Sequence, residues 1–187
     1  LLEPIDEALQ GTSRLRRIVS DLRAGIDETP IKDAAVDVAA PIESALKMAA
    51  HALKPHAHVT TEIEPNLPAV VADARLAQVF LNVLLNAGEA CTQHPDGHIA
   101  VAVRRRGQDH VVVAITDNGR GMGEATARLA FEPFFTTREG KGGTGLGLWI
   151  SRSSVESFGG TLELRSALRA GTVVEIVLLI SSADPAR

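Results

Sequence analysis

The sequence predicts an α+β fold, in which helices and hairpin-forming strands share one chain of 187 residues. Three segments repeat apolar side chains with the period of a helix, at about 41–53, 73–91 and 147–158. Two further segments, 99–116 and 162–180, each read as a pair of short strands around a turn. A sheet built from such hairpins needs helices to cover its apolar face, which is the arrangement of an α+β domain.

The first segment of the chain is predicted to be one long helix, from Leu1 to about Ala24. Its apolar residues recur at alternating steps of four and three, a heptad pattern that favours a partner helix. The alternative is a helix packed on its own globular domain. Because the chain begins inside this pattern, we expect it to be part of a longer protein. We divide it into a helix at 1–25, a linker at 26–35, a globular domain at 36–182 and a tail at 183–187.

The remaining elements follow from local patterns. Pro41 is expected to begin the first helix of the domain, because proline is favoured in a first helical turn. A strand at 59–63 and an extended pair at 70–71 lead to Asp73, which is predicted to cap the long second helix. The glycine-rich connection 117–147 contains one short helical piece. A connection of that length inside a compact domain is usually functional.

Composition limits the class of protein. The net charge is −4 and no basic stripe follows any element, so nucleic acid is not expected as a partner. The single Cys91 excludes a disulfide within the chain and suits a reducing, cytoplasmic compartment. No apolar run approaches the roughly 20 residues of a membrane span, so we expect no membrane contact by this chain.

Three polar side chains are candidates for a binding site. Asn82 and Asn86 lie four residues apart on one helix face, and a carboxamide oxygen can join the shell of a hydrated Mg²⁺. The alternative is two exposed polar residues. Asp117 ends a buried-looking strand, where a carboxylate can accept a hydrogen bond from an exocyclic amine such as that of adenine. The alternative is an ordinary Asp-Asn-Gly turn. Gly119 and Gly121 are expected to allow close backbone approach and positive φ.

A glycine-rich turn at 142–147 opens directly into an apolar helix, so backbone amides and the positive helix end would face an anion. Its spacing fits neither a Walker A loop nor a dinucleotide-binding fingerprint. Three phenylalanines at 131–135 precede it, and we interpret them as a packing anchor. Arg138 and Lys141 lie between the two, as candidates to meet a γ-phosphate or as solvated charges.

Taken together, these segments resemble the four sequence boxes of the GHKL ATPases, most closely the catalytic domain of bacterial sensor histidine kinases. The resemblance implies a two-layer α/β sandwich with a mixed sheet of about five strands, three main helices and an ATP lid. It also implies that the N-terminal helix is the second helix of a dimerisation and phosphotransfer hairpin. The boxes are 82–90 (N box), 117–121 (first glycine box), 131–137 (F box) and 143–147 (second glycine box), followed by the pair Gly171-Thr172.

The resemblance implies ATP or ADP and Mg²⁺ as cofactors. Asn86 would bind Mg²⁺, Asn82 would support the phosphates, and Asp117 would bond adenine. Many relatives carry a basic residue three positions after the metal-binding asparagine, where this chain has Glu89. That departure makes Arg138 and Lys141 the candidate cations. The implied nucleotide-binding residues are Asn82, Asn86, Asp117, Gly119, Gly121, Arg138, Lys141, Gly143, Thr144, Gly145, Leu146, Gly147 and Thr172.

The family's substrate histidine should lie on the first hairpin helix, and none of the six histidines here lies in a heptad pattern. We therefore expect the ATP-binding catalytic part of a two-component histidine protein kinase. It would present the γ-phosphate to a histidine outside this chain, for relay to an aspartate of a response-regulator receiver domain. The missing hairpin helix and a second kinase subunit are the other expected partners. His56 and His58 lack an evident third metal ligand and are expected on a surface strand.

Three other functions are weighed against this one. An ATP-hydrolysing clamp needs a carboxylate base four residues before the metal-binding asparagine, where this chain has Asn82. A serine kinase of the anti-sigma type has similar boxes, but the N-terminal heptad helix argues against it. A pseudokinase that binds nucleotide only as a scaffold is disfavoured by the intact boxes.

Overall fold

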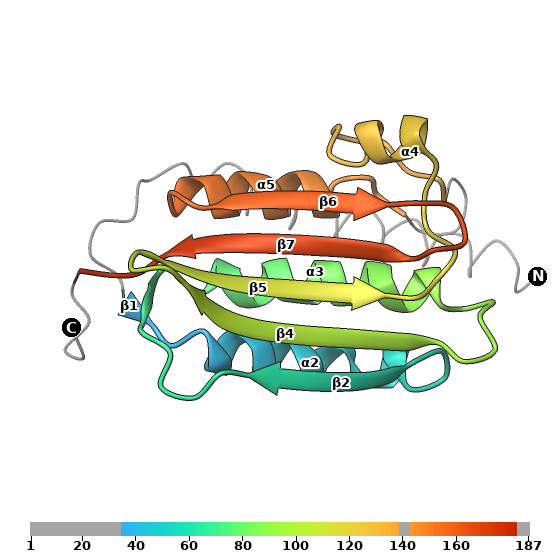
Figure 1. Cartoon of the computed structure of the whole chain (residues 1–187). Coiled ribbons are helices and arrows are strands. Elements are labelled where there is room, and N and C mark those ends of the chain that lie inside the picture. The colour runs from blue at the N-terminus through green and yellow to red at the C-terminus, as the bar shows by residue number, and fades with distance from the viewer. Residues whose placement is uncertain (1–34, 139–142, 183–187) are drawn as a thin grey trace, which may run out of the picture.

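The structure is a computed structural model that describes residues 35–138 and 143–182. The predicted N-terminal helix, Lys141 and the predicted tail at 183–187 lie outside the described residues. Within them, a five-stranded sheet forms one layer, and α2, α3 and α5 lie together against one of its faces (Figure 1). The predicted two-layer α+β arrangement is therefore confirmed.

Both predicted hairpins are present and lie side by side in the sheet. β4 (His98–Arg106) pairs with β5 (His110–Asp117), and β6 (Thr161–Ser166) pairs with β7 (Thr172–Leu179), each antiparallel. β5 and β7 also pair antiparallel, so the two hairpins join into one sheet. This pairing sets the carboxyl end of β5 opposite the start of β7, with Asp117 facing Thr172.

The sheet is completed by a strand that comes from earlier in the chain. β2 (His58–Ile63) pairs with β4 in parallel, which gives the strand order β2–β4–β5–β7–β6. A parallel neighbour requires a crossover, and the long helix between these two strands supplies it. β1 (Ala35–Val36) and β3 (Val70–Val71) pair antiparallel in a separate two-stranded sheet.

The helices occur where the apolar periodicity predicts them. α2 (Ala39–Leu53), α3 (Arg75–Ala90) and α5 (Gly147–Ser157) are the three main helices, and α4 (Glu124–Leu129) is the short helical piece of the glycine-rich connection. α3 lies between the other two and packs against both. No helix within the described residues is long and apolar enough to cross a membrane.

Two helix starts differ slightly from expectation. α2 begins at Ala39 rather than at Pro41, because the Asp37 carboxylate accepts the N–H of Ala39 at 3.0 Å. Asp73 lies two residues before the first helical residue of α3, and its Oδ1 accepts the N–H of Arg75 at 2.8 Å. Asp73 therefore satisfies an otherwise free amide at this helix start, as a cap does.

The core lies between the sheet and the helices. Alternate residues of β4 and β5 are buried beneath α3, as the strand pattern predicts. The predicted apolar face of α3 is buried against them and comprises Leu76, Val79, Phe80, Val83, Leu84 and Ala87. Burying this stripe fixes the rotation of α3, so its remaining side chains must face its neighbours or solvent.

Candidate functional site

A large cleft runs along α3 and is bordered by the end of α2, the start of α5, the end of β5 and the segment around α4. Its volume is about 1580 Å³. Gly119, Gly143 and Leu146 do not line it, and Leu146 is fully buried. The other predicted site residues that the structure describes all line it: Asn82, Asn86, Asp117, Gly121, Arg138, Thr144, Gly145, Gly147 and Thr172.

Asp117 provides a hydrogen-bond acceptor in this cleft. Its side chain is only 7% exposed, and Oδ1 accepts the N–H of Gly119 at 2.9 Å. Burial raises the pKa of the Asp117 carboxyl above its ordinary value, while hydrogen bonds from the backbone amides of Gly119 and Thr172 act in the opposite direction. A carboxylate held in this way can accept a hydrogen bond from a ligand amine that enters the cleft.

The two glycines after Asp117 let the chain pack closely on itself. A Cβ on Gly121 would lie 1.9 Å from the carbonyl oxygen of Ala167, and Gly121 has a φ of +61°. A Cβ on Gly119 would lie 2.5 Å from the backbone of Ala90, but Gly119 has no positive φ. The expectation of close approach is confirmed for both residues, whereas positive φ is confirmed only for Gly121. The loop is thereby held against the end of α3 and the β6–β7 turn.

The two asparagines of α3 have different surroundings. The Asn82 amide nitrogen lies 3.3 Å from both the Gly147 carbonyl oxygen and the Ser151 hydroxyl, so it ties α3 to the first turn of α5. The Gln78 amide donates to the Asn82 oxygen at 2.9 Å. Asn86 is half-buried and makes no side-chain hydrogen bond within the described residues. Asn82 is therefore committed to positioning α5, and the Asn86 oxygen is available to a ligand.

Ser151 is a residue of this site that sequence reasoning missed. It is fully buried, and its hydroxyl donates to the Gly147 carbonyl oxygen at 2.8 Å. The only signal in the sequence is a serine four residues after the last glycine of the turn, a spacing that allows this bond to the preceding turn. Together with Asn82, Ser151 fixes the direction of the helix start that faces the cleft.

The glycine turn packs against the backbone of the phenylalanine segment. Gly145 has a φ of +68°, and a Cβ there would lie 2.4 Å from the carbonyl carbon of Phe134. Phe134 itself has a φ of +66° and is 64% exposed. Phe131 packs against the core and lies beneath the Arg152 guanidinium, 5.0 Å from its ring centre. The interpretation as a packing anchor therefore fits the Phe131 side chain, whereas Phe134 contacts the turn through its backbone.

An ion pair crosses the cleft between α3 and the segment after Phe135. The guanidinium of Arg138 lies 3.7 Å from the carboxylate of Glu89. Sequence reasoning singled out both residues but did not pair them, because 49 positions separate them in the sequence. The candidate cation Arg138 therefore already has an anionic partner in the structure.

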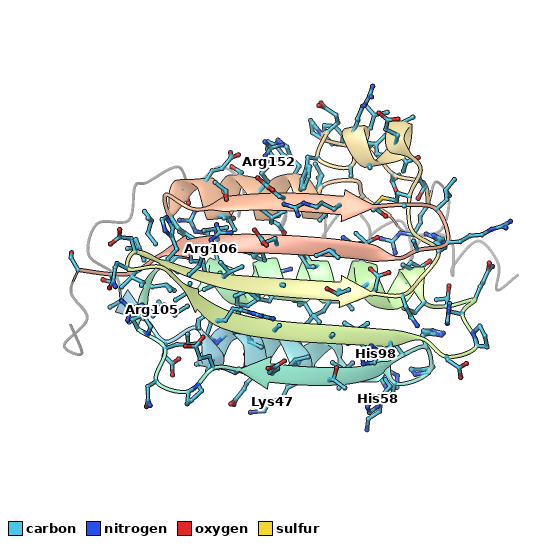
Figure 2. The ribbon with its side chains drawn as sticks, in the orientation of Figure 1. Lys47, His58, His98, Arg105, Arg106 and Arg152 are labelled. Atoms are coloured by element: carbon cyan, nitrogen blue, oxygen red, sulfur yellow. The ribbon has the colours of Figure 1, made fainter. Side chains whose placement is uncertain are left out.

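The histidines do not form a metal centre within the described residues. His58 on β2 stacks on His98 of β4, with ring centres 6.1 Å apart, on the strand face that Figure 2 shows toward the viewer. The Thr60 hydroxyl lies 3.0 Å from His98 Nε2. His58 is exposed on a strand, as expected from the sequence, whereas the same expectation is wrong for His56, which lies half-buried in the turn before β2.

Comparison with known proteins places the site in a family. Residues 72–182 match the family described as histidine kinase-, DNA gyrase B- and HSP90-like ATPase. A putative sensor protein of Shewanella frigidimarina (strain NCIMB 400) is 31% identical over 94% of this chain, and the sensor histidine kinase ZraS of Klebsiella oxytoca is 35% identical over 90%. The chain spans 27% and 36% of the length of these two relatives.

Solved structures agree with this match. The mycobacterial sensor histidine kinase MprB superposes with a TM-score of 0.69 at 29% identity, covering 79% of this chain and 97% of that one. The family match covers the cleft from α3 to β7, including all four sequence boxes. The chain therefore belongs to the family of histidine kinase-, DNA gyrase B- and HSP90-like ATPases.

Proposed function

We propose that this chain is the ATP-binding catalytic part of a two-component sensor histidine kinase. The observation that carries the proposal is the arrangement along one cleft of a buried acceptor, Asp117, an available carboxamide, Asn86, and the free amides at the start of α5. Asp117 matches the adenine amine of ATP, and Asn86 matches a metal ion bound to the phosphates. The amides at the start of α5 match the phosphate oxygens. The names of the relatives favour a kinase among the activities of the family.

The adenine would bind at the end of β5. Its exocyclic amine would donate to the Asp117 carboxylate, which the amides of Gly119 and Thr172 already orient. Thr172 is buried beside it, and its hydroxyl lies 2.9 Å from the Ser166 hydroxyl. These contacts hold the acceptor in one position before the ligand arrives, which lowers the entropic cost of binding.

The phosphates would bind at the glycine turn. The first amides of a helix have no partner within the helix, and the helix dipole adds positive potential there. The bonds from Asn82 and Ser151 to the Gly147 carbonyl hold the start of α5 toward the cleft. Asn82 therefore supports the phosphates by positioning the turn. Arg138 and Lys141 are the proposed cations for the γ-phosphate.

The residues of the cleft suit a magnesium ion that is shared with phosphates. Asn86 offers one neutral oxygen, and a hydrated Mg²⁺ commonly takes few protein ligands beside water and phosphate. When bound, the ion would neutralise charge on the β- and γ-phosphates. Asn86 would hold the ion within the cleft.

The proposed partners follow from the proposed kinase. A helical hairpin with the phosphoacceptor histidine, a second kinase subunit and the receiver domain of a response regulator would complete the pathway of the phosphoryl group. We place this domain of the kinase in the cytoplasm, where ATP and response regulators occur.

A hydrolytic clamp is less well supported by the geometry. Water activation needs a general base, and the amide of Asn82 donates its hydrogens to the Gly147 carbonyl and the Ser151 hydroxyl. A group that donates in this position cannot remove a proton from water. Phosphoryl transfer to a histidine depends on positioning and charge neutralisation, which the cleft residues provide.

The adenine assignment predicts a loss of affinity in Asp117→Asn. The substitution replaces a charged acceptor by an amide, so we expect ADP to bind at least about tenfold more weakly, as measured by calorimetric titration. Asp96→Asn is the matched control, because that side chain is exposed and lies outside the cleft. Equal ADP affinity of Asp117→Asn and wild type would remove Asp117 from the adenine site.

The raised pKa of Asp117 predicts opposite pH trends in stability and binding. The folded protein holds this proton more tightly than the unfolded chain, so its contribution to stability falls as pH rises from the unfolded to the folded pKa. Adenine binding needs the ionised acceptor and should weaken as pH falls through the same raised pKa. Denaturant unfolding and ADP titration of wild type and Asp117→Asn over a pH series measure both differences. We expect wild type to lose stability relative to Asp117→Asn as pH rises. A gain in the stability of wild type relative to the variant over the same pH range would contradict the burial effect.

The metal assignment predicts that Asn86→Ala loses most of the dependence of ADP binding on Mg²⁺. Without the carboxamide oxygen, the ion would be held by phosphate and water alone. Titrations of ADP with and without Mg²⁺ measure the enhancement, and Gln93→Ala, which is exposed outside the cleft, should retain it. A full Mg²⁺ enhancement in Asn86→Ala would show that another group holds the ion.

The kinase assignment predicts how the chain uses γ-labelled ATP. We expect nucleotide binding without steady phosphate release and without stable label on the chain. Among the described histidines only His51 lies on a helix, and that helix, α2, packs against α3 within the domain and does not form a separate hairpin. Phosphate release and acid- and base-stable labelling are followed in the same reaction. Steady release abolished by Asn82→Ala would favour a clamp, and acid-stable label on a serine would favour a serine kinase.

A further inference from the structure

The ion pair between Glu89 and Arg138 connects two parts of the cleft. Glu89 lies at the end of α3, and Arg138 lies in the connection between α4 and α5. Their side chains are 37% and 32% exposed, and both residues line the cleft. The pair is therefore accessible to a ligand that enters the cleft.

Arg138 is held beside the proposed phosphate position by several contacts. Its backbone N–H donates to the Thr136 hydroxyl at 3.0 Å, and a Cβ on Gly143 would lie 3.0 Å from the Arg138 Cβ. Glu89 is three residues beyond Asn86, so both project from the same face of α3. Arg138 thus lies beside the glycine turn and pairs with a residue on the face of α3 that carries Asn86.

The other arginines that line the cleft have different positions. Arg75 pairs with Asp73 at 2.9 Å and lies over the Phe158 ring, at the start of α3. Arg120 lies within the first glycine box, and its backbone is bonded to Ala90 and Arg169. Among the described residues, Arg138 is the arginine of the cleft that contacts the glycine turn.

We propose that Glu89 and Arg138 form a latch that the γ-phosphate of ATP opens. Without a γ-phosphate, Arg138 stays paired with Glu89, and with ATP it exchanges the carboxylate for γ-phosphate oxygens. The exchange is favoured because a partly exposed ion pair with 3.7 Å between its charged atoms is weak, whereas a phosphate offers more charge and a two-pronged contact to a guanidinium. Glu89 is then a specificity-determining residue that sets how strongly the site distinguishes ATP from ADP. This inference rests on the proposed nucleotide site.

The latch has a distinct signature in a double-mutant cycle. ADP and a non-hydrolysable β,γ-imido analogue of ATP are titrated with Mg²⁺ into wild type, Glu89→Gln, Arg138→Gln and the double variant of the full chain. The readout is the ratio of the analogue's affinity to that of ADP. We expect Glu89→Gln to raise this ratio about two- to fivefold and Arg138→Gln to lower it. With Arg138 absent, Glu89→Gln should leave the ratio unchanged.

A matched pair on α2 controls for general charge effects. Glu43 and Lys47 lie 3.8 Å apart, are mostly exposed and do not line the cleft. Figure 2 shows Lys47 beside α2 at the lower edge of the molecule, across α3 from α5. Glu43→Gln and Lys47→Gln should leave the ratio unchanged. Thermal unfolding and ADP binding establish that each variant is folded.

Two results would overturn the latch while leaving the nucleotide site intact. The ratio could be insensitive to Glu89→Gln, or Glu89→Gln could shift it equally with and without Arg138, which would mean simple repulsion between Glu89 and phosphate. Failure of folded wild type to bind either nucleotide is a different result, because it removes the proposed site and the latch with it.

Discussion

The burial of one face of α3 is the constraint on which the rest of the site depends. Six apolar residues of this helix pack against the sheet, and that contact fixes its rotation. The polar residues Asn82, Asn86 and Glu89 are consequently directed to the cleft and to α5. α3 also lies between α2 and α5, so any rotation would disturb packing on both sides. The positions of the proposed metal and phosphates therefore depend on the hydrophobic core.

A second set of contacts connects α3 to the glycine turn and restricts the conformation of that turn. Asn82 and Ser151 both bond to the Gly147 carbonyl oxygen, and the backbone of Phe134 packs on Gly145. Glycines alone would allow many conformations, which would cost entropy when phosphate binds. The bonds restrict the turn before binding, so its amides can face one position. The strained backbone of Phe134 is consistent with a turn that is held by its surroundings.

The periodic features of the fold could be predicted from the sequence, because each depends on local spacing. The apolar repeats placed α2, α3 and α5, and the alternating pattern placed both hairpins. The parallel pairing of β2 with β4 could not be derived from local pattern, because it joins strands that a long helix separates. The resemblance implied a mixed sheet but did not specify which strands pair in parallel. The helix starts were displaced by one or two residues for a different reason: an aspartate side chain beside each start accepts a backbone N–H, and apolar periodicity does not locate that bond.

The sequence predicted which residues form the candidate site, but it did not predict which of them contact one another. Motif spacing identified Asn86 and Asp117, and the structure brings both to one cleft. The tie from Asn82 to Ser151 and the pair between Glu89 and Arg138 depend on side chains that are 69 and 49 positions apart in the sequence. Such contacts are decided by the packing of α3 against α5 and by the path of the glycine-rich connection, which no local pattern specifies.

The polar groups of the cleft differ in how many hydrogen-bond partners the folded protein itself gives them. Among the described residues, every fully buried side-chain nitrogen or oxygen already has a hydrogen-bond partner. Asp117 meets this condition through backbone amides, yet burial still raises its pKa because the charge has lost most of its water. A donor from a ligand would offset that loss, since it adds a hydrogen bond to the charged form. In the part of the chain that the structure describes, Asn86 has no such protein partner. It remains half-exposed to water, which is the state expected of a group that exchanges water for a ligand.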